Sequence, residues 1–312
     1  MAAPQPHVPA MPVLTREQIA FFHREGFLVA KDVIPRGVIE AVAAEIDSLV
    51  DASADALHAD GKIADKHSEL GYLHRAEALY AQCPEINGMV SGGVGFPKPS
   101  ERRPTAGKAF FNLLTCDAIL TIMEQLFDSS EVFVSGVYRL RCKLPGRDNG
   151  VVPWHQDQCF FAPISDAKPS PTDWSDMPPV ITTWVPLMDA TVETGAMQVL
   201  APAQRGLHKH YNANVTAPGT TIHPDHFPEG ARVVDVPAMI GDALIFSAYA
   251  PHRSTENTAG VVRWAADLRY NVPEAGNYYP GEGGFLGRSS REPAVTDWRK
   301  HTRNPRRNFP GG

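Results

Sequence analysis

The pattern of hydrophobic positions changes near residue 131. Before this point apolar residues recur at helical spacing, and after it they fall into short alternating or apolar runs that proline and glycine interrupt. The helical segments are 15–26, 36–50 and 118–126. The runs that predict strands are 131–144, 151–161, 180–188, 196–200, 232–236, 243–249 and 261–272. Helices followed by many short strands predict a mainly β fold, a jelly-roll or cupin-like double-stranded β-helix with flanking N-terminal helices.

Domain organisation follows from the same pattern. Residues 1–13 are rich in proline, and we expect them to be disordered. The chain has no internal repeat and no linker, which predicts a single domain over residues 14–312. Residues 51–107 show no clear pattern, and the Gly/Tyr/Pro-rich segment 277–287 predicts a mobile cover.

Composition narrows the function classes. The chain has 312 residues, 43% of them hydrophobic and 21% charged, with a formal net charge of -6. This charge gives no basic surface for nucleic acid. We find no signal peptide and no uninterrupted apolar run of about 20 residues, so we expect a cytoplasmic protein that does not bind a membrane. The four cysteines are widely spaced, without a CxxC pair, which indicates reduced thiols rather than a disulfide framework or a zinc site.

The candidate chemistry begins with His155 and Asp157, which Gln156 separates. Side chains at i and i+2 of a strand share one face, so one strand end can supply two metal ligands. His252 follows a short apolar strand and can supply a third. Two imidazoles and one carboxylate hold Fe(II) on one face and leave the other face open. A lone HxD pattern is weak, because a histidine on a strand is more often structural.

Four sequence motifs occur in a fixed order and strengthen this interpretation. They are Trp154-His155-Gln156-Asp157, the segment 193–199 (ETGAMQV), the segment 241–246 (GDALIF), and Pro251-His252-Arg253-Ser254 with Asn257 and Arg263. Together with the opening segment 14–29, they make the chain resemble the phytanoyl-CoA dioxygenase (PhyH-like) family of Fe(II)/2-oxoglutarate oxygenases. The resemblance covers roughly residues 14–272 and implies Fe(II), 2-oxoglutarate and O2 as cofactor and co-substrates.

The resemblance also implies roles for single residues. His155, Asp157 and His252 match the iron ligands, and Arg263, eleven residues after His252, matches the residue that pairs with the distal carboxylate of 2-oxoglutarate. Four further positions match residues at the co-substrate: Ser254, Lys108, Arg139 and Trp184.

Plainer interpretations stand beside these. Arg263 shares its strand face with Asp267 and Arg269, so it points either to solvent or into a polar cavity. Lys108 closes a basic segment, 98–108, that is equally consistent with a solvated loop. The pair His208/His210 lacks a neighbouring carboxylate to complete a site, and we expect it to lie in a loop. We likewise expect His223 and His226, which Pro224-Asp225 separates, to be loop residues.

The expected reaction is hydroxylation of an aliphatic C–H bond of a small molecule, with release of succinate and CO2. The resemblance implies this reaction because related halogenases carry a small residue where this chain has Asp157. Desaturation and ring formation stay open. The substrate could be an acyl-CoA, an amino-acid-like solute or a natural product, and the sequence does not indicate the oligomeric state. Two other classes remain: a non-catalytic metal-binding jelly roll and a metal-dependent hydrolase.

Overall fold

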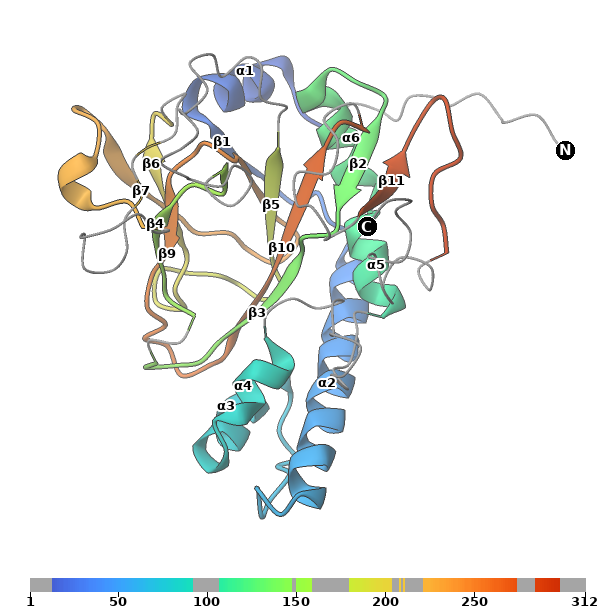
Figure 1. The fold of residues 1–312 in the computed structure, drawn as a ribbon, viewed down its shortest axis with the longest axis vertical. Helices are drawn as coiled ribbons and strands as arrows, with labels where there is room; N and C mark the ends of the chain where they lie inside the picture. Colours follow the sequence, from blue (N-terminus) through green and yellow to red (C-terminus); the bar gives the residue numbers. More distant parts are fainter. Residues whose placement is uncertain are drawn as a thin grey trace, which may run out of the picture.

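Two antiparallel β-sheets form the centre of the fold (Figure 1). The structure, a computed structural model, describes residues 13–91, 107–147, 150–158, 180–203, 208, 210, 221–273 and 284–297.

The larger sheet has the order β1-β8-β5-β10-β2-β11, with β3 also paired to β10, and the smaller sheet has the order β4-β9-β6-β7. The larger sheet comprises β1 (Phe27–Ala30), β2 (Val132–Ser135), β3 (Arg139–Lys143), β5 (Ile181–Pro186), β8 (Ala243–Ser247), β10 (Arg263–Asn271) and β11 (Gly284–Arg288). The smaller comprises β4 (Val152–His155), β6 (Met197–Ala201), β7 (Arg232–Val236) and β9 (His252–Ser254). The expected mainly β, jelly-roll-type fold is confirmed.

Helices cover one face of the larger sheet. They are α1 (Arg16–Glu25), α2 (Arg36–Ala59), α3 (Tyr72–Gln82), α4 (Glu85–Val90), α5 (Lys108–Leu114) and α6 (Asp117–Phe127). Figure 1 shows the long helix α2 with α5 beside it. Thr15 and Gln18 form a capping box at the start of α1, where the sequence predicts a helix from residue 15.

Strand β10 separates two cores because it is buried on both faces. Its even-numbered residues, such as Trp264 and Leu268, pack with the helices in the main hydrophobic core. Ala265, on the odd-numbered face, packs with Trp184 and with residues of the smaller sheet in a second core. The polar residues of this second face therefore lie between the two sheets, where the candidate site forms.

Several elements were not expected from the sequence. Helices α3 and α4 lie in the segment 51–107, and neither has a side-chain hydrogen bond at its N-cap, so the usual start signal is missing. Strand β11 occupies the end of the expected cover segment 277–287. A Cβ at Gly284 would lie 2.4 Å from the Phe133 ring, so glycine lets this strand approach β2 closely. The rest of that segment, and the N-terminal residues 1–12, lie outside the described residues.

One stretch of the described chain, Lys108–Phe127, is long and apolar enough to cross a membrane by length and composition alone. In the structure it is not one helix but α5 and α6, which Thr115 and Cys116 separate. The window is 61% buried inside the protein, and buried core helices pass the same test.

Candidate metal centre

Two neighbouring strands of the smaller sheet and the turn after β4 bring three side chains together. His155 at the end of β4 is the direct partner of His252 in β9, and their ring centroids lie 4.2 Å apart. Asp157 follows β4, and its Oδ1 lies 3.6 Å from His155 Nε2 and 4.0 Å from His252 Nε2. All three residues are buried, and their candidate ligand atoms lie within 4.8 Å of one another. Two imidazoles and a carboxylate at this separation can bind one metal ion.

Backbone carbonyls fix the protonation of both histidines. The Nδ1 atoms of His155 and His252 lie 2.9 Å from the carbonyl oxygens of Pro153 and Ala250, respectively. A carbonyl oxygen can only accept, so each Nδ1 carries the hydrogen and each Nε2 presents a lone pair to the centre. Burial, followed by the nearby His155, lowers the pKa of His252 to about 3. Both features suit neutral imidazole ligands.

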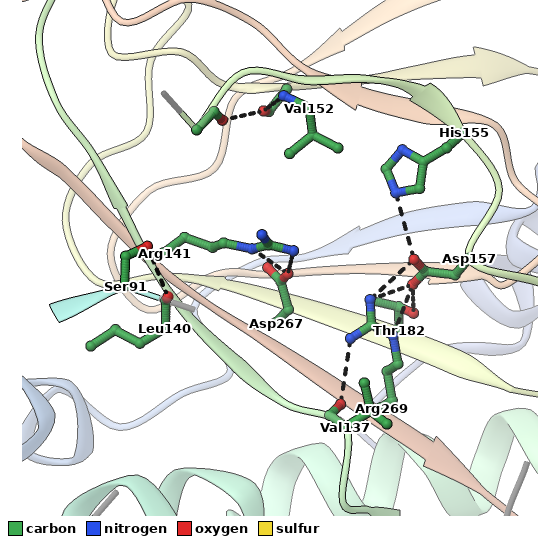
Figure 2. Close-up of polar contacts among 12 residues, drawn as sticks. Ser91, Val137, Leu140, Arg141, Val152, His155, Asp157, Thr182, Asp267 and Arg269 are labelled. Carbon is green, nitrogen blue, oxygen red and sulfur yellow. Dashed lines mark hydrogen bonds and ion pairs between the residues drawn. The ribbon is translucent and has the colours of Figure 1, made fainter. Parts of the chain in front are cut away.

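Arg269 and Thr182 hold the third group, Asp157 (Figure 2). Arg269 Nε and Nη2 each donate to the carboxylate at 3.0 Å, and Thr182 Oγ1 donates to its Oδ2 at 2.6 Å. Burial by itself would raise the pKa of Asp157, but the Arg269 charge holds that pKa well below its usual range. The carboxylate is therefore ionised and fixed in orientation before any metal binds. The sequence analysis missed this role of Arg269, although its place on the odd-numbered face of β10 was the available signal.

A cavity lies at this centre, between the two sheets. Both sheets line it, with Val152, Met197 and Ser254 on one side and Trp184, Phe246 and Arg263 on the other. The structure thus brings Trp184, Ser254 and Arg263 to one cavity with the three candidate ligands.

Arg263 lines this cavity and has no ion-pair partner within 4 Å among the described residues. It is 2% exposed, and its guanidinium lies 5.3 Å from the centre of the Trp184 ring. Its Nε and Nη1 have no hydrogen-bond partner within the described residues. Burial lowers the pKa of Arg263 to about 10, so the group stays charged at neutral pH. Buried donors are nearly always paired, and an unpaired guanidinium in a cavity is suited to binding a carboxylate.

Ser254 lines the same cavity, but its hydroxyl is already engaged. Its Oγ accepts hydrogen bonds from Lys143 Nζ at 2.9 Å and from Val152 N at 3.0 Å, and it donates to Gly150 O at 3.0 Å. Lys143, which the sequence analysis did not select, is fully buried and also donates to Thr255 O. Burial, followed by the Arg263 charge, lowers the pKa of Lys143 to about 6. To contact a bound molecule, the Ser254 hydroxyl has to turn away from Gly150.

The structure does not bring Lys108 and Arg139 to the cavity. Lys108 is exposed at the first residue of α5, and that helix packs on the opposite face of the larger sheet. Arg139 begins β3 and does not line the cavity; Arg141, two residues later on the same strand face, lines it instead. The Nε and Nη2 atoms of Arg141 each lie 2.7 Å from Asp267 Oδ2.

The pair His208 and His210 has a structural role. His210 Nε2 accepts a hydrogen bond from Gln156 N at 3.1 Å, and its Nδ1 lies 2.7 Å from His208 O. Gln156 Oε1 in turn accepts from His208 N at 2.7 Å. These contacts occupy the Nε2 lone pair of His210, and they attach this segment to the strand end that carries His155. A further cluster in the described chain, Asp65, His67 and Glu69, is largely exposed.

Comparisons with known proteins concern the family and the fold of the chain. The family model for phytanoyl-CoA dioxygenase (PhyH) matches residues 22–265. A search among curated proteins finds no match. Among solved structures, the nickel complex of the non-heme monooxygenase ThoJ is similar to this chain at 16% identity and a TM-score of 0.54, over 87% of this chain and 84% of that one. The apo form of ThoJ gives 16% identity and a TM-score of 0.53 over the same shares. The epimerase SnoN, in complex with Fe3+, alpha ketoglutarate and nogalamycin RO, gives 17% identity and a TM-score of 0.49, over 88% and 86%. At these identities the likeness concerns the fold.

Proposed function

The chain belongs to the phytanoyl-CoA dioxygenase family, and from that membership we propose that it is an Fe(II)- and 2-oxoglutarate-dependent dioxygenase. One observation carries the proposal most strongly. The same cavity holds a buried His-Asp-His cluster and a buried arginine whose Nε and Nη1 have no partner in the described chain. A metal ion fits the first, and the distal carboxylate of a dicarboxylate co-substrate fits the second.

The residues present fit both groups. His155, Asp157 and His252 would bind the iron, because both imidazoles present Nε2 lone pairs and the carboxylate is ionised. Once bound, the iron with 2-oxoglutarate and O2 supplies the oxidising chemistry that releases succinate and CO2 and hydroxylates the substrate.

The surrounding side chains bind and orient these groups. Arg263 would bind the distal carboxylate through its two unpaired nitrogens, with Trp184 as the wall on which the guanidinium rests. Arg269 and Thr182 keep the ligand carboxylate in place, and the apolar Met197 and Phe246 limit the entry of water. The Ser254 hydroxyl joins the carboxylate only after rotation, and Lys108 and Arg139 are not part of the proposed co-substrate site.

The proposed substrate is a small molecule with an accessible aliphatic C–H bond, an acyl-CoA, an amino-acid-like solute or a natural product. Hydroxylation is the proposed outcome. We further propose that residues 14–312 act as one domain.

Succinate formation tests this proposal. Aerobic incubation with Fe(II) and 2-oxoglutarate should release succinate, and a screen of candidate metabolites should reveal those that stimulate it. His155→Ala and Asp157→Ala should abolish the release, whereas Arg36→Gln, a change on the exposed surface of α2, should not.

Three results would reject the proposal. Succinate release at the wild-type rate by His155→Ala or Asp157→Ala would show that these residues are not the iron ligands. Hydrolysis of a substrate that needs the metal but not 2-oxoglutarate would favour a hydrolase. Metal binding with no turnover of any kind would favour a non-catalytic protein.

A further inference from the structure

A second carboxylate, Asp267, lies in the part of the cavity where the co-substrate carboxylate is proposed to bind. Asp267 in β10 is the direct partner of Trp184 in β5, the residue on which the Arg263 guanidinium rests. Its side chain is 10% exposed and lines the cavity with both of these residues. A resident carboxylate at such a point repels an incoming carboxylate unless its charge is balanced.

Arg141 supplies that balance. Its Nε and Nη2 each lie 2.7 Å from Asp267 Oδ2, and its side chain is 33% exposed (Figure 2). Burial by itself would raise the pKa of Asp267, but the charges of Arg141 and Arg269 keep it below the usual range, so Asp267 is ionised at neutral pH.

Among the described residues, three arginines and two aspartates line the cavity. Arg269 is paired with Asp157, Arg141 is paired with Asp267, and Arg263 lacks a carboxylate partner within the described residues. Asp267 thus reduces the net positive charge of the cavity, and Arg141 prevents Asp267 from neutralising Arg263.

We propose that the Arg141–Asp267 ion pair sets the affinity of the site for its dicarboxylate co-substrate. The inference rests on the proposed function, since it takes 2-oxoglutarate as the co-substrate and Arg263 as its clamp. Asp267 and Arg141 are positioning residues in this role, because they act through the charge that Arg263 presents. Removing Asp267 strengthens binding of the distal carboxylate, removing Arg141 weakens it, and removing both restores it.

Calorimetric titration of the Co(II)-loaded protein with 2-oxoglutarate, without oxygen, tests the direction of these three changes in affinity. Asp267→Asn is expected to lower the Kd for 2-oxoglutarate about tenfold, and Arg141→Gln to raise it about tenfold, the usual range for a charge in a partly buried site. The double variant is expected within about threefold of wild type. Two exposed changes of the same type serve as controls, Asp235→Asn on β7 and Arg36→Gln on α2.

A second ligand separates the two ends of the co-substrate. 2-Oxobutyrate has the same 2-oxo acid group as 2-oxoglutarate but no distal carboxylate, so its Kd is expected to change less than threefold in each variant. An equal change for both ligands would place the effect at the metal and overturn the inference. A weaker binding of 2-oxoglutarate in both single variants would overturn it too, since the pair would then be only structural. If Asp267→Asn does not fold, the Kd of Arg141→Gln for 2-oxoglutarate tests the inference by itself. No binding of 2-oxoglutarate to the metal-loaded wild type would overturn the proposed function itself.

Discussion

Replacing Arg269 with methionine tests how the apo protein keeps a buried carboxylate ionised. The change removes both hydrogen bonds, each of 3.0 Å, that Arg269 donates to Asp157, and it leaves the bond from Thr182. Asp157 is 1% exposed, so water cannot replace the lost cation. Breaking a buried ion pair by removing one partner costs about 3–5 kcal/mol.

This free energy converts to a measurable change in Tm. An unfolding entropy of about 2.1 cal/mol/K per residue over this chain gives a decrease of about 5–8 °C for the metal-free variant. Differential scanning calorimetry measures it, with Arg36→Met, in which an exposed arginine is replaced, as the control. A bound divalent cation replaces the lost charge, so saturating Co(II) should raise the Tm of Arg269→Met more than that of wild type.

The decrease should also depend on pH. In wild type the folded-state pKa of Asp157 is depressed, so the stabilisation is fully present above the unfolded pKa of about 3.9 and is lost as pH falls through the folded pKa. In the variant, burial raises the pKa of Asp157 because Arg269 no longer opposes it. The Tm difference should therefore be larger at pH 8 than at pH 5. A metal-free variant as stable as wild type at pH 8, or one that Co(II) stabilises less than wild type, would refute this account of Asp157.

Three further changes test other parts of the site. Arg263→Gln should raise the KM for 2-oxoglutarate by at least about tenfold, because a charge-assisted bond is lost, while Co(II) affinity by calorimetry stays within about threefold; equal losses of both would contradict the clamp. His210→Ala should lower the free energy of unfolding by about 1–3 kcal/mol in urea titrations, because Gln156 N loses its acceptor. Burial lowers the pKa of His210 to about 4, so wild type should lose stability as pH falls from about 6.5 to 4, and the variant should lose less of it. Gly195→Ala should destabilise by about 2 kcal/mol or more, since φ is +82° and a Cβ would lie 2.8 Å from Thr255 O; an unchanged urea midpoint would contradict this.

The sequence predicted the elements whose periodicity is unbroken. The runs around β5, β7, β8 and β10 matched observed strands. β5, β8 and β10 are buried along nearly their whole length, whereas β7 is mostly exposed. It missed α3 and α4, whose starts have no side-chain cap, and β11, whose glycines resemble a loop but permit close contact with β2.

Within the site, the sequence predicted those side chains whose direction follows from their spacing along one strand. The i, i+2 pair His155 and Asp157 meets His252 as expected, and Arg263 points into the cavity rather than to solvent. The face of β10 that carries Arg269 was predicted, but the ion pairs of Arg269 and Arg141 were not, because both residues meet partners far apart in the chain. Register between strands decides these pairs, and the sequence alone does not give it.

The central claim is that one cavity binds Fe(II) through His155, Asp157 and His252 and binds 2-oxoglutarate beside it. Titration of the Fe(II)-loaded protein with 2-oxoglutarate under nitrogen tests this directly, because a 2-oxo acid bound to Fe(II) absorbs visible light. The account predicts a saturable visible band for wild type, no band without Fe(II), and no band for His155→Ala. Absence of the band from Fe(II)-loaded wild type, or an undiminished band in His155→Ala, would contradict it.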